Sequence, residues 1–340
     1  MTEPRRYDEA LNQYNESLNL YNVTLDRVNE PLYLYNEALN QYNEPLHREN
    51  GRCMGAWAWR FCFTTASRGR VGDMAAYGDD LAYIHDSGFG DFARGAAPGV
   101  LQTLRRNGVK DGLVVDLGCG SGIWAEILLA EGYDVLGVDL SPGMLALARR
   151  RAPEAIFLEG SLHEVKLPRC AAVTALGECI NYLFDPEEPD VPAAIAGAAV
   201  LRSLFARVHA ALQPGGLFIF DVAEPGQILP DRPRHGLTSG PCWAITVDVR
   251  EDAKARILTR RMSFLRFEAD DLRRGEEVHR QRLYPKKEVK TALVEAGFEV
   301  RTARAYGSVP LALAHTAFIA RKPAVRRGGI GDGRRPRKPR

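Results

Sequence analysis

The sequence lacks the segments that direct a chain to a membrane or anchor it there. Its 340 residues include no run of about 18 apolar residues, and the first ten, MTEPRRYDEA, contain no apolar signal core. The six cysteines show neither metal-ligand nor disulfide-framework spacing; they stand at positions 53, 62, 119, 170, 179 and 242. We therefore expect a protein of the reducing cytoplasm, with no membrane contact and no metal.

Excess positive charge is also absent from the body of the chain. The formal net charge is +2, but residues 325–340 contain seven Lys or Arg and one Asp, so this tail carries +6 and the rest −4. Nucleic-acid-binding domains present basic patches on a folded body. The charge distribution argues against a nucleic-acid partner, and the Gly- and Arg-rich stretch 324–340 is typical of a disordered, solvated tail.

The N-terminal part consists of six tandem heptapeptides, which run over residues 7–48 from YDEALNQ to YNEPLHR. Tyr and Leu recur at spacings of three and four, as in a coiled-coil seam, whereas Pro31, Pro45 and many Asn residues disfavour a helix. A disordered or frayed segment, a stable helix and a functional arm all remain open. We expect residues 1–73 to be an extension and residues 74–323 to form the folded domain.

Within that domain, apolar strands alternate with amphipathic helices. Strands are expected at 113–116, 135–139, 155–158, 171–176 and 217–222, with helices at 96–106, 123–131, 144–151 and 193–212. This alternation predicts a doubly wound, mostly parallel sheet of the α/β class. Alternating runs at 243–249, 256–267 and 278–284 predict an antiparallel cap of about three strands, inserted at about 224–285. A helix at 286–296 and strands at 298–303 and 316–321 complete seven strands in the main sheet.

The most informative stretch is LVVDLGCGSG, from Leu113 to Gly122, where a buried strand runs into a glycine-rich turn and a helix. No Lys-Ser/Thr follows the glycines, which excludes a Walker-type phosphate loop, and Ile123 breaks the dinucleotide spacing. Asp116 at the strand end would repel a pyrophosphate but could pair with an ammonium group. Asp139, which ends the second strand, could accept both hydroxyls of a ribose. These features favour an adenosine ligand that carries an amino acid.

Two motifs in this region resemble a known family. DLGCGSG (116–122) and VDLSPGM (138–144) are similar to the first two motifs of class I S-adenosylmethionine-dependent methyltransferases. The resemblance extends from about Tyr77 to Pro323 and includes GSL at 160–162, GECINY at 177–182, LQPGG at 212–216 and AGF at 296–298. It implies a Rossmann-like fold and S-adenosyl-L-methionine as the cofactor.

The resemblance also implies a set of cofactor-binding residues. In such a site the glycine turn lines the methionine moiety, the acid after the second strand binds the ribose, and apolar residues flank the adenine. Ser161 stands where the family more often has Asp, so its contact with the adenine edge would be a weaker hydrogen bond. The implied residues are Asp116, Gly118, Cys119, Gly120, Asp139, Leu140, Met144, Ser161, Leu162 and Gly177.

Catalytic residues are not fixed by any motif. Methyl transfer from a sulfonium requires alignment and exclusion of water, and it needs a base only when the acceptor must lose a proton. Glu178 and Tyr182, just after the fourth strand, and His85, before the first, are the candidates. In the cap, His279 and Gln281 alternate to the face opposite Arg280, Arg282 and Tyr284, and the arginines suit either an anionic substrate or solvent.

The sequence therefore predicts an enzyme that transfers a methyl group to a small molecule. The base-amino methyltransferase motif Asn-Pro-Pro-Tyr is missing after the fourth strand, where GECINYL stands instead. Two alternatives remain open. A protein on the same fold could bind S-adenosylmethionine without turnover, and a nicotinamide-dependent oxidoreductase would require phosphate spacing that the turn lacks.

Overall fold

The computed structural model describes residues 77–183, 193–228, 235–268 and 271–324. The predictions for the heptapeptide extension 1–73 and for the tail after residue 324 lie outside these residues. In the described part of the chain, no helix is both long and apolar enough to span a membrane.

Seven strands form the main sheet, in the order β10-β13-β5-β4-β1-β2-β3. The pairs among β1 to β5 are parallel, whereas β13 is antiparallel to β5 and to β10. The strands are β1 (Leu113–Leu117), β2 (Asp134–Asp139), β3 (Ile156–Glu159), β4 (Cys170–Ala175), β5 (Leu212–Ala223), β10 (Glu299–Ala303) and β13 (His315–Arg321). The predicted doubly wound, mostly parallel sheet of seven strands is confirmed.

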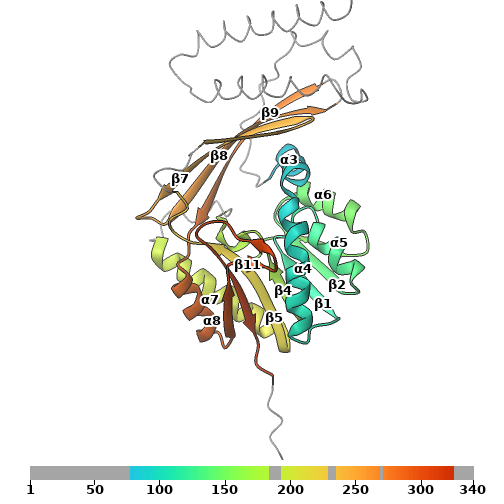
Figure 1. The fold of residues 1–340 in the computed structure, drawn as a ribbon, viewed down its shortest axis with the longest axis vertical. Helices are drawn as coiled ribbons and strands as arrows, with labels where there is room; N and C mark the ends of the chain where they lie inside the picture. Colours follow the sequence, from blue (N-terminus) through green and yellow to red (C-terminus); the bar gives the residue numbers. More distant parts are fainter. Residues whose placement is uncertain (1–76, 184–192, 229–234, 269–270, 325–340) are drawn as a thin grey trace, which may run out of the picture.

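The sheet is covered on both faces, which explains why its central strands are continuous apolar runs. In β1, Val114 belongs to the core on one face, and Val115 and Leu117 belong to the core on the other. One layer contains α4 (Asp91–Arg106), α5 (Ile123–Ala130) and α6 (Pro142–Arg151), and the other contains α7 (Ala193–Ala211) and α8 (Lys286–Glu295), as Figure 1 shows.

Local sequence signals set the start of α6. The Ser141 hydroxyl accepts a hydrogen bond from the backbone N–H of Met144 at 3.0 Å, and Pro142 occupies the first helical turn. This is the N-cap and first-turn pair that the sequence predicts. It places the residues after β2 at the carboxyl edge of the sheet.

The insertion after β5 is a four-stranded antiparallel sheet, which we call the cap sheet. It consists of β6 (His235–Gly240), β7 (Trp243–Asp252), β8 (Ile257–Glu268) and β9 (Asp271–Arg282). The sequence predicted about three strands. It missed β6, because HGLTSG contains two glycines and no alternation of apolar and polar residues. In Figure 1 the cap sheet lies beyond the carboxyl edge of the main sheet.

Helix α3 (Asp79–Phe89) connects the two sheets. Leu81 and Ile84 on this helix share a buried apolar cluster with Trp243, Met262 and other inward-facing residues of the cap sheet. The helix also packs against α6 of the main domain. The position of α3 therefore couples the cap sheet to the helices that follow the glycine turn.

Helix α4 begins earlier than the sequence predicts, at Asp91 rather than near Ala96, and it contains Pro98 in its interior. The early turns are favoured by Asp91 at the positive end of the helix and by buried alanines on its inner face. Gly99 lies against the small hairpin of β11 (Ala305–Tyr306) and β12 (Val309–Pro310). The hairpin approaches so closely because Gly99 has no side chain.

We predict that Gly99→Ala destabilises the protein. An added Cβ would lie 2.3 Å from the backbone N of Gly307 and 2.4 Å from the carbonyl carbon of Tyr306, and backbone atoms cannot move aside as a side-chain tip can. The expected loss is about 1–3 kcal/mol of unfolding free energy, measured by urea denaturation.

The matched control is Gly95→Ala, four residues earlier in the same helix. There the nearest atom is the Val309 side-chain Cγ2 at 3.2 Å, and alanine favours the helix by about 0.8–1 kcal/mol. Gly95→Ala should be as stable as wild type or more stable. Equal stability of the two variants would contradict the tight packing at Gly99.

Candidate active site

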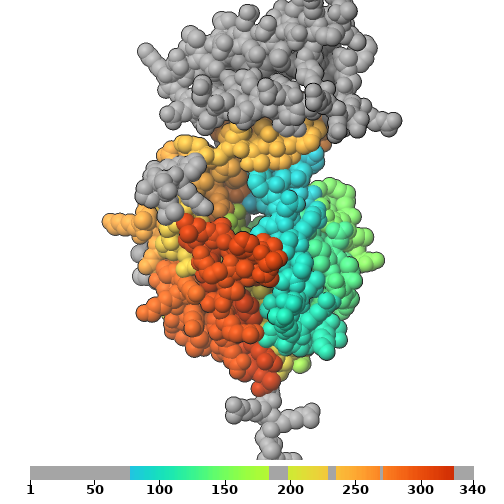
Figure 2. Space-filling model, in the orientation of Figure 1, coloured from blue at the N-terminus to red at the C-terminus, as the bar shows by residue number. Residues whose placement is uncertain are grey.

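The candidate site lies where the carboxyl ends of the parallel strands face the cap sheet. Ligands in open α/β sheets bind at this edge. Figure 2 shows a recess in the surface between α3, in cyan, and the cap-sheet strands, in yellow to orange. Among the described residues, no group of three or more His, Cys, Asp or Glu side chains is placed to hold a metal ion.

The glycine turn after β1 is fastened to the neighbouring strand β2. The backbone N–H groups of Gly118 and Cys119 both donate to the carbonyl of Val138, at 2.8 and 3.0 Å. Gly118, Gly120 and Gly122 have φ values of 70°, 52° and 78°, which favour glycine. A Cβ at Gly118 would lie 2.6 Å from the Cys179 sulfur, whereas one at Gly120 would enter open space. A ligand can therefore approach the backbone closely at Gly120.

Asp139 ends β2 and binds the same turn. One carboxylate oxygen accepts the N–H of Gly120 at 2.8 Å, and the other accepts the N–H of Ser141 at 2.9 Å. Burial raises the pKa of Asp139, and these backbone donors partly offset the increase. A carboxylate has about four acceptor positions, so the side chain can accept further hydrogen bonds from a ligand.

Asp116 lies behind the turn, with only 3% of its surface exposed. The indole N–H of Trp124 donates to the Thr174 hydroxyl at 3.1 Å, and that hydroxyl donates to Asp116 at 2.7 Å. Burial raises the pKa of Asp116 to about 7 although the Thr174 hydrogen bond opposes the shift. The structure thus fixes the Asp116 side chain in a buried hydrogen-bond chain.

The other residues implied by the family resemblance lie around the same edge. Leu140, Leu162 and Gly177 are half-buried, and Met144 and Ser161 are buried. The Ser161 hydroxyl accepts the N–H of His163 at 3.1 Å. Cys119, between the two glycines, is also buried, with its sulfur close to Gly137.

Helix α3 is tied to the turn at one end and to the cap sheet at the other. Asp86 accepts a hydrogen bond from the Ser121 hydroxyl at 2.5 Å and forms an ion pair with Arg151 at 2.9 Å. Ahead of the helix, the Glu277 carboxylate from β9 accepts the N–H groups of Tyr77 and Gly78, each at 2.9 Å. These contacts hold α3 between the glycine turn and the cap sheet.

His85, a predicted catalytic candidate, lies on this helix beside the Tyr77 ring, with 5.3 Å between the ring centroids. Burial lowers the pKa of His85 to about 4, although Asp86 opposes the shift. The side chain is therefore neutral near pH 7. It contacts the candidate site through Tyr77.

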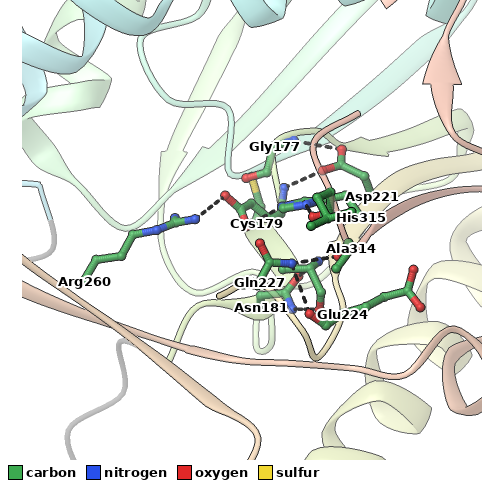
Figure 3. Close-up of polar contacts among 12 residues, drawn as sticks. Gly177, Cys179, Asn181, Asp221, Glu224, Gln227, Arg260, Ala314 and His315 are labelled. Carbon is green, nitrogen blue, oxygen red and sulfur yellow. Dashed lines mark hydrogen bonds and ion pairs between the residues drawn. The ribbon is translucent and has the colours of Figure 1, made fainter. Parts of the chain in front are cut away.

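Glu178 is the centre of a buried ionic group with Arg260 and His315. Figure 3 labels these two partners. The Glu178 carboxylate accepts from Arg260 of β8 at 2.9 Å and lies 3.0 Å from Nε2 of His315 on β13. Burial alone would raise the pKa of Glu178, but Arg260 and His315 outweigh burial and lower it to about 2. The Glu178 side chain is therefore ionised and already engaged by two partners.

The backbone at Glu178 is also held in an uncommon conformation. Its φ is 55°, in the left-handed region that non-glycine residues rarely adopt. The N–H groups of Gly177 and Glu178 donate to the two oxygens of Asp221, at 2.9 and 2.8 Å, and the Tyr306 hydroxyl donates to the same carboxylate. Asp221 therefore fixes the turn that presents Glu178.

The partners of both ring nitrogens favour the doubly protonated form of His315. Its Nδ1 lies 2.8 Å from the carbonyl of Leu313, and its Nε2 faces the Glu178 carboxylate, so both ring nitrogens meet acceptors. Burial lowers the pKa of His315, but the hydrogen bond and charge of Glu178 outweigh burial and raise it. With His315 protonated, Glu178, Arg260 and His315 together carry one net positive charge.

Aromatic side chains lie beside this group. The hydroxyls of Tyr77 and Tyr182 lie 3.0 Å apart, and Arg260 reaches to 3.4 Å from the Tyr182 oxygen. The His279 ring of β9 lies 4.6 Å from the Tyr77 ring. We call the six residues of this region the cap-facing cluster: Tyr77, Glu178, Tyr182, Arg260, His279 and His315.

The structure therefore brings two of the three predicted catalytic candidates, Glu178 and Tyr182, into one cluster. Sequence reasoning did not find Tyr77, Arg260 or His315. The alternation in the cap did place His279 on one face of its strand, and that face points inward. Arg280, on the opposite face, is exposed, whereas Tyr284, predicted on the same face as Arg280, lies after β9 and is buried.

Comparisons with known proteins agree with this geometry. A family model described as a methyltransferase domain matches residues 114–216, from β1 to the start of β5. A dTDP-3-amino-3,6-dideoxy-alpha-D-glucopyranose N,N-dimethyltransferase of Streptomyces fradiae is 29% identical over 249 residues, which cover 69% of this chain and 89% of that protein.

Solved structures share the fold. An S-adenosylmethionine-dependent methyltransferase from Clostridium acetobutylicum matches with a TM-score of 0.60 at 17% identity, over 72% of this chain and 98% of that one. A sugar N-methyltransferase from a Streptoalloteichus species matches with a TM-score of 0.57 at 22% identity, over 74% and 98% of the two chains.

The sequence matches and the glycine turn lead to the same family. The turn, with its open position at Gly120 and the carboxylate of Asp139 beside it, suits an adenosine ligand rather than a diphosphate. The chain is an S-adenosylmethionine-dependent methyltransferase whose methyl donor is S-adenosyl-L-methionine, and in sequence and fold it is similar to the class I members.

Proposed function

We propose that this enzyme methylates a small molecule held between the carboxyl edge of the main sheet and the cap sheet. The observation that carries the proposal is the pairing of Asp139 with Gly120 beside an open turn. Ser141 links this pair to the cap-facing cluster, because its N–H donates to Asp139 and its hydroxyl donates to the Tyr77 carbonyl at 2.6 Å. The Streptomyces fradiae relative is named for a nucleotide-linked amino sugar, which makes an amino sugar the first acceptor to test.

The proposed donor site keeps the residues that the family resemblance implies. Asp139 would accept the ribose hydroxyls, and the turn around Gly120 would contact the methionine moiety. Asp116 is the candidate partner of the donor's ammonium group, because a nearby cation would lower its raised pKa and restore its charge. The remaining proposed contacts are Gly118, Cys119, Leu140, Met144, Ser161, Leu162 and Gly177.

The residues on the acceptor side would position the acceptor and exclude water. S-adenosylmethionine supplies an already activated methyl group when it is bound. Glu178 is committed to Arg260 and His315, and burial raises the pKa of Tyr182, so neither is an effective base near neutral pH. We infer that Glu178 orders the cluster as an anion, and that the acceptor arrives in a form able to react without transferring a proton to the enzyme.

We also propose a reducing compartment, the cytoplasm. The cysteines of the described residues are free thiols, at positions 119, 170, 179 and 242. Burial raises the pKa of Cys119 and of Cys179, which keeps both as unreactive thiols. Chains with free, buried thiols are typical of reducing compartments.

The alternative is a protein that binds the donor without turnover. A product assay distinguishes the two. An active enzyme given S-adenosylmethionine and an amino-sugar nucleotide releases S-adenosylhomocysteine. A binding protein with the same donor affinity releases none across a panel of amine, hydroxyl and carboxylate acceptors.

The donor site can be tested at Asp139. Asp139→Ala should weaken S-adenosylmethionine binding by about 1.5–3 kcal/mol in calorimetric titration, because it removes charge-assisted hydrogen bonds to the ribose. The control is Asp134→Ala, which removes an exposed acid from the opposite end of the same strand. It should bind the donor as wild type does. Unchanged affinity in Asp139→Ala would remove the basis of the assigned donor site.

The ionic group can be tested at Glu178. Glu178→Gln should lower the free energy of unfolding by about 3 kcal/mol near pH 5.5, because it leaves Arg260 and His315 without their buried partner. The folded-state pKa of Glu178, about 2, lies below the ordinary 4.5, so the stabilisation by Glu178 is lost as the pH falls. The folded-state pKa of His315 lies above the ordinary 6.5, so the stabilisation by His315 is lost as the pH rises.

The loss of unfolding free energy in Glu178→Gln, relative to wild type, should therefore be largest between pH 4.5 and 6.5. It should be smaller below pH 4.5 and above pH 6.5. Urea denaturation at several pH values measures it. The control is Glu159→Gln, which changes an exposed acid at the end of β3. Its unfolding free energy should differ little from that of wild type at every pH. A difference for Glu178→Gln that does not vary with pH would contradict the ionic group.

A further inference from the structure

Gln281 on β9 is buried without a hydrogen-bond partner. None of its surface is exposed, and neither its amide nitrogen nor its amide oxygen has a partner among the described residues. Gln227, also buried, shows the usual situation: its amide nitrogen donates to the carbonyls of Glu224 at 3.0 Å and Ala314 at 2.7 Å. A buried amide with both atoms unpaired lowers stability unless another molecule pairs it.

The position of Gln281 connects it to the proposed acceptor site. It alternates with His279 on β9 and with Leu283 just after the strand, and all three are buried. It pairs directly with Leu258 on β8, two residues before Arg260, and forms an isolated antiparallel bridge with Tyr182. Gln281 therefore lies beside the cap-facing cluster, on the face of the cap sheet that the acceptor would meet.

The two unpaired atoms define the chemistry of the missing partner. The amide nitrogen needs an acceptor, and the amide oxygen needs a donor. A carboxylate could satisfy only the nitrogen, and an ammonium group only the oxygen. A hydroxyl group both donates and accepts, so one or two hydroxyls on the same molecule satisfy the whole amide.

We propose that Gln281 is a specificity-determining residue that binds a hydroxyl group of the methyl acceptor, so the substrate is a hydroxylated small molecule. This inference rests on the proposed function. It requires a hydroxyl group on the acceptor, which neither the fold nor the donor site requires. An acceptor of similar size without hydroxyls leaves the Gln281 amide unpaired and binds less well. The tyrosine hydroxyls of the cap-facing cluster provide further polar contacts for the same kind of molecule.

The first test measures stability without any acceptor. Gln281→Met replaces the amide with an apolar side chain of similar shape, and in thermal unfolding of the full chain it should melt at the same temperature as wild type or higher. The matched control, Gln227→Met, removes two real hydrogen bonds and should melt about 3 °C lower or more. An equal loss in both variants would show that Gln281 has a structural role and would overturn the proposal.

The second test measures binding to the protein loaded with S-adenosylhomocysteine. Glucosamine and cyclohexylamine each carry an amine on a six-membered ring, with and without hydroxyl groups. Wild type should bind glucosamine more tightly, and Gln281→Met should weaken glucosamine about tenfold while leaving cyclohexylamine unchanged. Equal glucosamine affinity in wild type and Gln281→Met would overturn the proposal.

The donor site and the Gln281 contact with a hydroxyl group can be contradicted independently. If S-adenosylhomocysteine binds to wild type but Gln281→Met has no effect on glucosamine, the hydroxyl contact is wrong and the methyltransferase assignment stands. If S-adenosylhomocysteine itself does not bind, the proposed donor site is wrong. Calorimetry of the donor product on wild type and on Gln281→Met separates these outcomes, because Gln281 should not affect donor binding.

Discussion

The donor side of this enzyme depends on the carboxylate of Asp139. Its two oxygens accept the N–H of Gly120 in the glycine turn and the N–H of Ser141 at the start of α6. One side chain thus fixes the relative positions of the glycine turn, the end of β2 and the start of α6. A ligand that binds there meets backbone groups held in place before it arrives, which reduces the ordering cost of binding.

A second carboxylate organises the acceptor side. Glu178 joins the turn after β4 to the cap sheet through Arg260 and to the last strand through His315. Asp221 holds the same turn from behind through two backbone N–H groups. Because these ions are buried together, their mutual attraction offsets the cost of removing them from water, and the loss of one leaves the others uncompensated. The cap sheet is thereby fixed over the edge where the donor and acceptor would meet.

The sequence predicts the local parts of this architecture and misses those that depend on distant residues. A few neighbouring residues specify each of these local parts, which are the parallel strands, the glycine turn and the helix N-cap at Ser141. The structure contains all three. Arg260 and His315 are 82 and 137 positions from Glu178, and no local pattern shows that they converge on it. Strand β6 was missed for a related reason, since pairing with β7 rather than its own composition makes it a strand.

The most direct measurement of the central claim is a crystal structure of the full chain with S-adenosylhomocysteine. The account predicts both ribose hydroxyls within hydrogen-bonding distance of the Asp139 carboxylate, the homocysteine portion along the turn at Gly120, and the sulfur directed toward the cap-facing cluster. A ligand whose ribose lies away from Asp139, or whose sulfur points away from Glu178 and Tyr182, would contradict it.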